Sequence, residues 1–176
     1  MLGKRNVYLI GPMGTGKTAV GKSLARLIGV PFLDSDAEIE KHAGVDIPYI
    51  FEQEGEAGFR RREREVLAEL CRREPLVLAT GGGAVLAAEN RELLKSTGVV
   101  VFLETSVAQQ LQRVGTGRGR PMLRGPDLVQ RLHELGRTRD PLYRETADIT
   151  LRTDGRRVHK VADLIVQALG LGGDAR

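Results

Sequence analysis

The chain has 176 residues, a length that fits one globular domain and is too short for two ordinary enzyme domains. Hydrophobic residues make up 41% and charged residues 28%, which excludes a disordered or collagen-like chain. No apolar run approaches the roughly 20 residues that cross a bilayer, and the N-terminus has no signal-peptide pattern. We therefore expect a cytoplasmic protein that does not bind membranes.

The positive charge is concentrated in one segment of the chain. The formal net charge is +4, and from Arg113 to Arg144 eight arginines accompany only three acidic residues. A guanidinium binds phosphate or carboxylate through two parallel hydrogen bonds. The chain has only seven aromatic residues, which argues against a stacking platform for single-stranded nucleic acid. A small anionic ligand is the better expectation.

Short apolar runs rich in β-branched residues predict five strands, at 7–10, 31–33, 76–80, 99–103 and 149–151. Amphipathic patterns predict helices at 18–28, 58–70, 89–95, 107–114, 128–139 and 157–169. The first helix is expected to have one apolar face, made of Val20, Leu24, Leu27 and Ile28. Strands that alternate with helices indicate an α/β fold with three layers, α/β/α, around a five-stranded parallel sheet. Ligands of such sheets bind at the carboxyl ends of the strands.

The segment from Gly11 to Thr18 reads GPMGTGKT and fits the pattern G-x-x-x-x-G-K-[ST], directly after a predicted strand and before a predicted helix. Its glycines allow successive backbone N–H groups to face one anion, and the helix N-terminus adds positive dipole. We expect Lys17 on the β- and γ-phosphates of a nucleotide and the Thr18 hydroxyl on Mg²⁺. The alternative is a glycine-rich turn that happens to contain a lysine.

Two carboxylates follow the second predicted strand. The period of two along a strand predicts that Asp34 and Asp36 point to the same side, toward the phosphate loop. One would complete a Mg²⁺ shell, and the other would accept the proton of a substrate hydroxyl. The alternative is a helix start, in which Ser35 and Glu38 form a capping box and Asp36 lies in the first turn.

The third predicted strand ends in Thr80 and three glycines, where many ATPases with a phosphate loop have a metal-binding acid. Because this strand ends without a carboxylate, the metal-binding acid is expected to be Asp34. The three glycines allow a ligand to approach the backbone closely. The predicted helix 58–70 has Arg60 and Glu63 beside its apolar stripe. We expect Arg60 to bind the carboxylate of a ligand and Glu63 to orient the Arg60 guanidinium.

Residues 115–126 contain too many glycines for a helix and form too long a connection for a simple turn. Such loops are often lids, and a kinase must exclude water from the transferring phosphate. We expect a mobile lid that brings an arginine to that phosphate on closure. A surface loop without this role is the alternative.

Six motifs, in their order and spacing, resemble the shikimate kinase family: GPMGTGKT at 11–18, DSD at 34–36, FRRRE at 59–63, TGGG at 80–83, RPML at 120–123 and RDPLY at 139–143. The resemblance covers nearly the whole chain, as a single domain over 1–176 with a substrate-binding region at about 34–63. It implies a P-loop fold like that of nucleoside monophosphate kinases. It also implies transfer of the γ-phosphate of ATP to the 3-hydroxyl of shikimate, on the route to chorismate and the aromatic amino acids. Met122 stands where the family usually has leucine, a substitution that conserves volume.

The resemblance also implies roles for single residues. The catalytic residues would be Lys17, Asp36 and Arg120, with Asp36 serving the substrate hydroxyls either as a base or only as a ligand. The nucleotide would contact Gly14, Thr15, Gly16, Lys17, Thr18, Ala19, Arg113, Arg120 and Arg156. Mg²⁺ would be bound by Thr18 and Asp34, and shikimate by Asp36, Arg60, Gly82 and Arg139. Arg137 is the alternative to Arg139 as the second ligand of the substrate carboxylate.

Two other kinds of function remain open on the sequence alone. One is another small-molecule kinase of this fold, such as a gluconate kinase or a nucleoside monophosphate kinase. The other is a basic P-loop switch or nucleic-acid-binding protein, whose affinity would fall steeply with salt. We expect a monomer that binds a small molecule and no nucleic acid.

Overall fold

The computed structural model describes residues 6–114 and 127–171. Within them, one parallel sheet has the strand order β2-β3-β1-β4-β5, with β1 at Asn6–Ile10, β2 at Phe32–Asp34, β3 at Val77–Ala79, β4 at Gly98–Glu104 and β5 at Ile149–Arg152. The helices are α1 Lys17–Ile28, α2 Ser35–Ala43, α3 Ile47–Leu70, α4 Ala88–Thr97, α5 Val107–Val114, α6 Leu128–Thr146 and α7 Val158–Ala168, with a short 3₁₀ helix, η2, at Ala84–Leu86. The predicted α/β class and five-stranded parallel sheet are confirmed.

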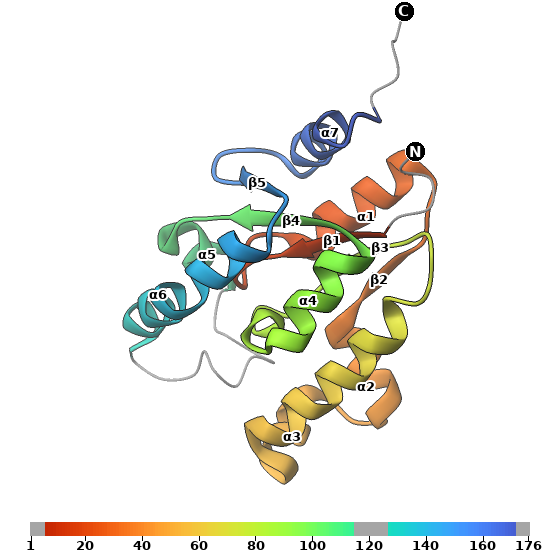
Figure 1. The fold of residues 1–176 in the computed structure, drawn as a ribbon. Coiled ribbons are helices and arrows are strands. Elements are labelled where there is room, and N and C mark those ends of the chain that lie inside the picture. The colour runs from red at the N-terminus through yellow and green to blue at the C-terminus, as the bar shows by residue number, and fades with distance from the viewer. Residues whose placement is uncertain (1–5, 115–126, 172–176) are drawn as a thin grey trace, which may run out of the picture.

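Helices cover both faces of the sheet (Figure 1). Val7 and Leu9 of β1 pack in a core with α1 and α7, whereas Tyr8 and Ile10 pack in a second core with α3, α4 and α6. All five residues of β1 are buried, as expected for a central strand between two helix layers. Because every strand pair is parallel, the carboxyl ends of the strands lie at one edge of the sheet.

Helix α1 packs with a narrower apolar face than the sequence suggested. Val20 and Leu24 are buried, but Leu27 is 55% exposed, so its expected place on the buried face is wrong. The buried stripe runs instead through Gly21, where an added Cβ would overlap the ring of Phe32. This glycine allows α1 to approach the sheet, and the close approach leaves Leu27 on the solvent side.

Two helices extend beyond their predicted bounds. Helix α6 continues through Pro141 to Thr146, although proline usually ends a helix. Helix α3 begins at Ile47, where Asp46 caps it by accepting a hydrogen bond from the Tyr49 N–H (2.9 Å). Its predicted start at residue 58 is wrong because a bend at Gly55 breaks the apolar period. There φ is 69° and ψ is −177°, a conformation that favours glycine.

Candidate active site

The phosphate loop lies between β1 and α1, as the sequence predicts. Gly14 and Gly16 have φ values of 82° and 85°, which turn the backbone around the N-terminus of α1. Lys17 is buried, and its Nζ donates hydrogen bonds to the carbonyl oxygens of Gly11 (2.7 Å) and Pro12 (2.9 Å). The N-cap of α1 is Gly16, and among residues 6–114 and 127–171 no side chain caps this helix start, so the N–H groups of its first turn are available to an anion.

A cavity of about 480 Å³ opens in front of this loop. Predicted site residues from four segments line it: Gly14, Gly16, Lys17, Thr18, Ala19, Asp34, Asp36, Gly82 and Arg113. The structure therefore brings together most of the residues assigned to the nucleotide, the metal and the acceptor. Thr15, also in the loop, is fully buried. Arg120 and Met122 lie outside the described residues, as does the whole predicted lid at 115–126.

Asp34 occupies the junction of β2 and α2. Its Oδ1 accepts hydrogen bonds from the backbone N–H groups of Asp36 (2.9 Å) and Ala37 (3.3 Å), and so caps α2. Its Oδ2 accepts a hydrogen bond from the Thr18 hydroxyl (2.8 Å). One carboxylate thus starts a helix and also faces the hydroxyl that follows the phosphate-loop lysine.

The alternative of a helix start is confirmed in part. Helix α2 begins here with Asp36 in its first turn, but the cap is Asp34, one residue before Ser35, so the capping box of Ser35 and Glu38 is wrong. Ser35 is instead buried, and its Oγ accepts a hydrogen bond from the Gly81 N–H (3.0 Å). The period-two argument for Asp36 also fails, since β2 ends at Asp34 and Asp36 lies in the first turn of α2. Both carboxylates nevertheless line the same cavity.

Arg60 and Glu63 form the ion pair that the sequence predicts. Nη1 of Arg60 lies 2.9 Å from Oε1 of Glu63, and Nη2 lies 3.5 Å from Glu56. Glu63 is 1% exposed, and burial raises the pKa of its carboxyl, an effect that the Arg60 guanidinium opposes. The carboxylate of Asp36 also raises this pKa and the guanidinium of Arg139 lowers it, so two acids and two guanidiniums interact in a poorly solvated space.

The glycine triplet 81–83 lies where these charged groups meet. A Cβ added to the first glycine would lie 2.7 Å from Oδ1 of Asp36, and one added to the second would lie 3.4 Å from Nη1 of Arg139. A Cβ added to the third would overlap the guanidinium of Arg60. Three consecutive glycines therefore let one carboxylate and two guanidiniums converge on the same stretch of backbone.

Burial distinguishes the two candidate arginines of α6. Arg139 is 3% exposed and borders a second cavity, of about 540 Å³, between α3, η2 and α6. Arg137 is exposed. Only Arg139 has the close approach to Gly82 described above, which favours it over Arg137 as a ligand in the site.

Tyr143, one helical turn after Arg139, is a further residue of this site. Its hydroxyl donates a hydrogen bond to the carbonyl oxygen of Gly82, and its ring stacks on Phe102 at 5.0 Å. Burial raises the pKa of Tyr143 to about 12, so the hydroxyl is protonated at neutral pH. The sequence indicates Tyr143 only as the last residue of the motif RDPLY. No local pattern links it to a glycine 61 positions away.

Of the residues predicted to contact a nucleotide in the second half of the chain, Arg113 lies on α5. Gln110 donates a hydrogen bond from Nε2 to the carbonyl oxygen of Met13 (2.8 Å), which fixes α5 against the phosphate loop. Arg113, one turn later, lies over this loop, where a Cβ on Gly16 would be 2.7 Å from its Nη1. Arg156 lies in the exposed loop between β5 and α7 and does not line the cavity in front of the loop.

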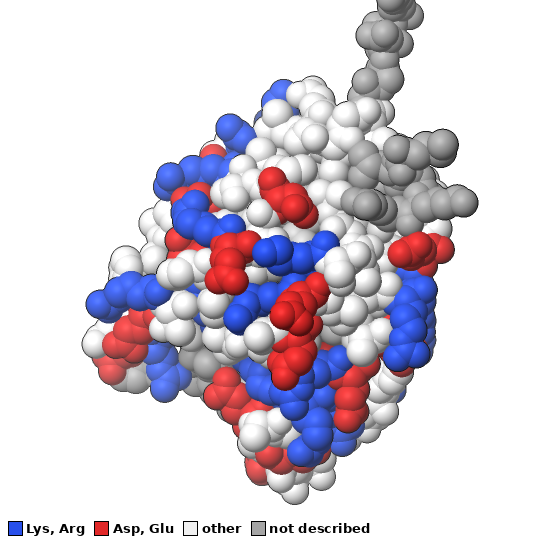
Figure 2. Space-filling model, viewed as in Figure 1, with Lys and Arg blue, Asp and Glu red and all other residues white. Residues whose placement is uncertain are grey.

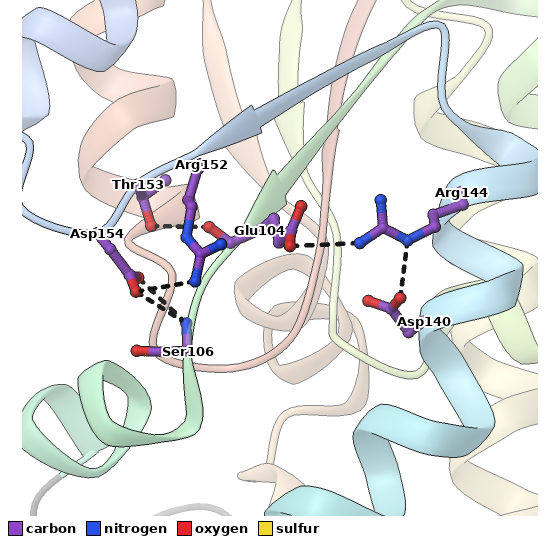
Figure 3. Close-up of polar contacts among 7 residues, drawn as sticks. All are labelled: Glu104, Ser106, Asp140, Arg144, Arg152, Thr153 and Asp154. Carbon is purple, nitrogen blue, oxygen red and sulfur yellow. Dashed lines mark hydrogen bonds and ion pairs between the residues drawn. The ribbon is translucent and has the colours of Figure 1, made fainter.

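A polar network ties that exposed loop to its neighbours (Figure 3). Asp154 accepts hydrogen bonds from the Thr105 hydroxyl (2.6 Å) and from the Ser106 N–H (3.1 Å), at the start of α5. On the other side of β4, Arg144 of α6 pairs with the Glu104 carboxylate at 3.3 Å. The network therefore links α5 and α6 through the carboxyl ends of β4 and β5.

Charged side chains of both signs are mixed over the face formed by α3, α4 and α6 (Figure 2). On α3, Arg61 and Arg62 both pair with Glu54, at 3.7 and 2.8 Å. In the part of the chain that the structure describes, no helix is long and apolar enough to cross a membrane.

Comparison with known proteins gives a consistent result. The family model described as shikimate kinase matches residues 13–170. A shikimate kinase of Methylococcus capsulatus is 53% identical over 173 residues, which cover 98% of this chain and 97% of that protein. A shikimate kinase of Acinetobacter baumannii is 53% identical over 164 residues, or 93% of this chain and 91% of that protein.

Solved structures distinguish the family from its fold neighbours. A shikimate kinase from Acinetobacter baumannii, in complex with shikimate, superimposes with a TM-score of 0.93 at 52% identity, covering 98% of this chain and 96% of that chain. A gluconokinase from Sinorhizobium meliloti gives a TM-score of 0.54 at 16% identity, covering 97% and 94%, which indicates a common fold alone. The resemblance inferred from six sequence motifs is therefore confirmed, and the chain belongs to the shikimate kinase family.

Proposed function

We propose that this chain transfers the γ-phosphate of ATP to the 3-hydroxyl of shikimate, giving shikimate 3-phosphate and ADP. One observation supports this most directly: Asp36, Arg60 and Arg139 converge on the glycine triplet beside the phosphate loop. An acceptor with a carboxylate at one end and hydroxyls at the other matches two guanidiniums and one carboxylate. The site would work within a single domain spanning 1–176, as a cytoplasmic monomer.

The nucleotide would be bound by the phosphate loop, from Gly14 to Ala19, and by the first-turn N–H groups of α1. Lys17 lies at the centre of this loop, where its ammonium would stabilise the charge that develops on the transferring phosphate. Arg113 and Arg156 would flank the base. Arg120 would contact the transferring phosphate, a role that rests on the sequence resemblance.

Thr18 and Asp34 fit a Mg²⁺ site that is completed by the phosphates of ATP. Mg²⁺ takes oxygen ligands and is usually bound by one or two carboxylates together with substrate phosphates. The Thr18 hydroxyl and Asp34 Oδ2 lie 2.8 Å apart in the wall of the cavity, so both oxygens are available at one place. When bound, the ion would neutralise charge on the transferring phosphate.

The acceptor would be bound through both of its ends. Arg60 and Arg139 would hold the carboxylate of shikimate, with Glu63 keeping the Arg60 guanidinium in place. Asp36 would accept hydrogen bonds from the ring hydroxyls and would take the proton of the attacking hydroxyl. The backbone N–H of Gly82 would contribute a further donor. This arrangement holds the nucleophile in line with the γ-phosphate and leaves little freedom to the ring.

The test is ADP release measured with shikimate, gluconate and AMP as parallel acceptors, in the presence of ATP and Mg²⁺. We expect turnover with shikimate, with ³¹P NMR identifying the product as the 3-phosphate. Asp36→Asn should lower kcat strongly, and light scattering should give the mass of one chain. Turnover with gluconate or AMP but not with shikimate would refute the proposal.

A further inference from the structure

The backbone of the glycine triplet is fixed by side chains from two distant helices. The Gly81 N–H donates a hydrogen bond to Ser35 at the start of α2, and the Gly82 carbonyl accepts one from Tyr143 in α6. Over residues 6–114 and 127–171, no protein group accepts a hydrogen bond from the N–H of Gly82 or Gly83. The Gly83 N–H is in the same trans peptide group as the Gly82 carbonyl and points opposite to it, so it faces away from Tyr143.

Helix α6 delivers two functional groups to the same peptide. The Arg139 guanidinium lies next to Gly82, and the Tyr143 hydroxyl bonds to the carbonyl of that residue. Four residues separate these side chains, so they lie on one face of the helix, one turn apart. The position of the Gly82 peptide relative to Arg139 thus depends on the Tyr143 hydroxyl.

The Tyr143 ring is itself held firmly. It is 1% exposed and stacks on Phe102 of the central sheet at an interplanar angle of 26°. A ring with no room to turn gives its hydroxyl one place to point, and here that place is a glycine carbonyl. Glycine alone would allow this peptide many conformations. The rigid tyrosine supplies the restraint that the triplet lacks.

We propose that Tyr143 is a positioning residue of the acceptor site: its hydroxyl holds the Gly82 carbonyl toward α6, so that the N–H groups of the triplet and the Arg139 guanidinium face the substrate carboxylate together. The inference rests on the proposed function of this site. It predicts that removing one buried oxygen atom, without changing the packing of the ring, weakens the binding of the acceptor and not that of ATP.

Tyr143→Phe is the direct test, because phenylalanine keeps the stack on Phe102. We expect KM for shikimate to rise roughly three- to ten-fold, as for the loss of one buried hydrogen bond. KM for ATP should stay within about two-fold of wild type. In protein labelled with ¹⁵N-glycine, the amide signals of Gly82 and Gly83 should shift, because the Gly83 N–H belongs to the same peptide group as the Gly82 carbonyl.

Tyr8→Phe is the matched control. Tyr8 is also fully buried, and its hydroxyl is hydrogen-bonded to Thr97 (2.7 Å) and Asn6 (2.9 Å), but it lies in β1 rather than in the site. The Tyr8→Phe substitution should lower the melting temperature about as much as Tyr143→Phe does, while leaving KM for shikimate unchanged. An equal rise of KM in both variants would indicate general destabilisation and overturn the inference.

A double-mutant cycle with Arg139→Lys tests the coupling itself. If Tyr143 acts by placing Gly82 against Arg139, the two substitutions should weaken shikimate binding less in combination than the product of their single effects. An unchanged KM together with an unshifted Gly82 amide signal would overturn the inference while the proposed function stands. If the wild-type protein phosphorylates no shikimate, the proposed function fails, and the Gly82 amide signal still decides whether Tyr143 holds the loop.

Discussion

The two ends of the candidate active site are built in different ways. The phosphate loop consists of eight consecutive residues whose donors are mostly backbone groups, with a single lysine bonded to carbonyls of its own loop. The acceptor end uses α2, α3, the glycine triplet and α6, and places Glu63 and Arg139 out of contact with solvent. A change in helix packing should therefore affect the acceptor before it affects ATP.

The largest effect on activity is expected at the phosphate loop. Lys17→Met should lower kcat by about 10²–10³-fold, because the lost ammonium faces charge that grows in the transition state. The melting temperature should change little, since the side chain contacts the loop rather than the core. Lys22→Met, at an exposed position of the same helix, is the control and should keep wild-type kcat. A Lys17→Met enzyme with near-normal kcat would place the phosphate site elsewhere.

At the acceptor end, Arg139→Ala should weaken shikimate binding by about 1.5–3 kcal/mol, the range for a hydrogen bond to a charged group. Calorimetric titration with shikimate and with ATP should show the loss for shikimate alone. Arg137→Ala is the matched control, because this neighbouring arginine is exposed. A larger effect of Arg137→Ala would reverse the assignment of the two arginines.

Glu63 makes the stability of the acceptor end depend on pH. Burial raises the pKa of its carboxyl in the folded state above roughly 4.3, the value for an exposed glutamate. Between the pKa of Glu63 in the unfolded chain and its raised pKa in the folded chain, the folded chain binds more protons than the unfolded chain. The free energy of unfolding therefore falls as pH rises through this window.

Glu63→Gln removes this titration. In urea unfolding at pH values from 4 to 8, the stability advantage of wild type over the variant should shrink as pH rises, by up to about 1.4 kcal/mol per pH unit within the window. Shikimate binding should also weaken, since the Arg60 guanidinium loses its ionic partner. A stability difference that is constant over this range would contradict the prediction.

The smallest effect is expected where α5 meets the loop after β5. Asp154→Asn weakens the contacts to Thr105 and Ser106 that hold this loop against α5, which carries Arg113. KM for ATP should rise about two- to three-fold, the equivalent of roughly 0.5 kcal/mol, with KM for shikimate unchanged. Asp163→Asn, on the exposed side of α7, should change neither constant.

Acid should weaken the same contact. The hydrogen bond from Thr105 holds the pKa of Asp154 below its usual range, so its contribution to stability is present above about pH 4 and is lost as pH falls through the lower, folded value. Urea unfolding of wild type and Asp154→Asn below pH 4 should therefore converge.

The same contrast decides what the sequence could predict. The phosphate loop is contiguous, and its flanking strand and helix follow a clear hydrophobic period, so the sequence predicts its place between β1 and α1 correctly. The sequence predicts the correct edge of the sheet for Asp34 and Asp36, but the period-two argument for Asp36 is wrong. A strand end and a helix start can both point side chains into one cavity.

Contacts between distant elements could not be predicted. The hydrogen bond from Tyr143 to Gly82 depends on how α6 packs on β4, and nothing in the local pattern of either segment indicates it. The choice between Arg137 and Arg139 depends on which side of α6 is buried, and both arginines lie inside the predicted helix 128–139. The start of α3 was missed because Gly55 interrupts its period.

The bend at Gly55 has a consequence for the dimensions of the molecule. At 1.5 Å per residue, a straight helix of the 24 residues in α3 would measure about 36 Å, which is comparable to the diameter of the whole domain. Its first turns would then project into solvent and take Ile50 and Phe51 away from the core that both contact. The bend divides this length into two shorter arms that follow the curvature of the domain. A single residue without a side chain thus lets two helical arms follow one another directly, with no longer loop between them.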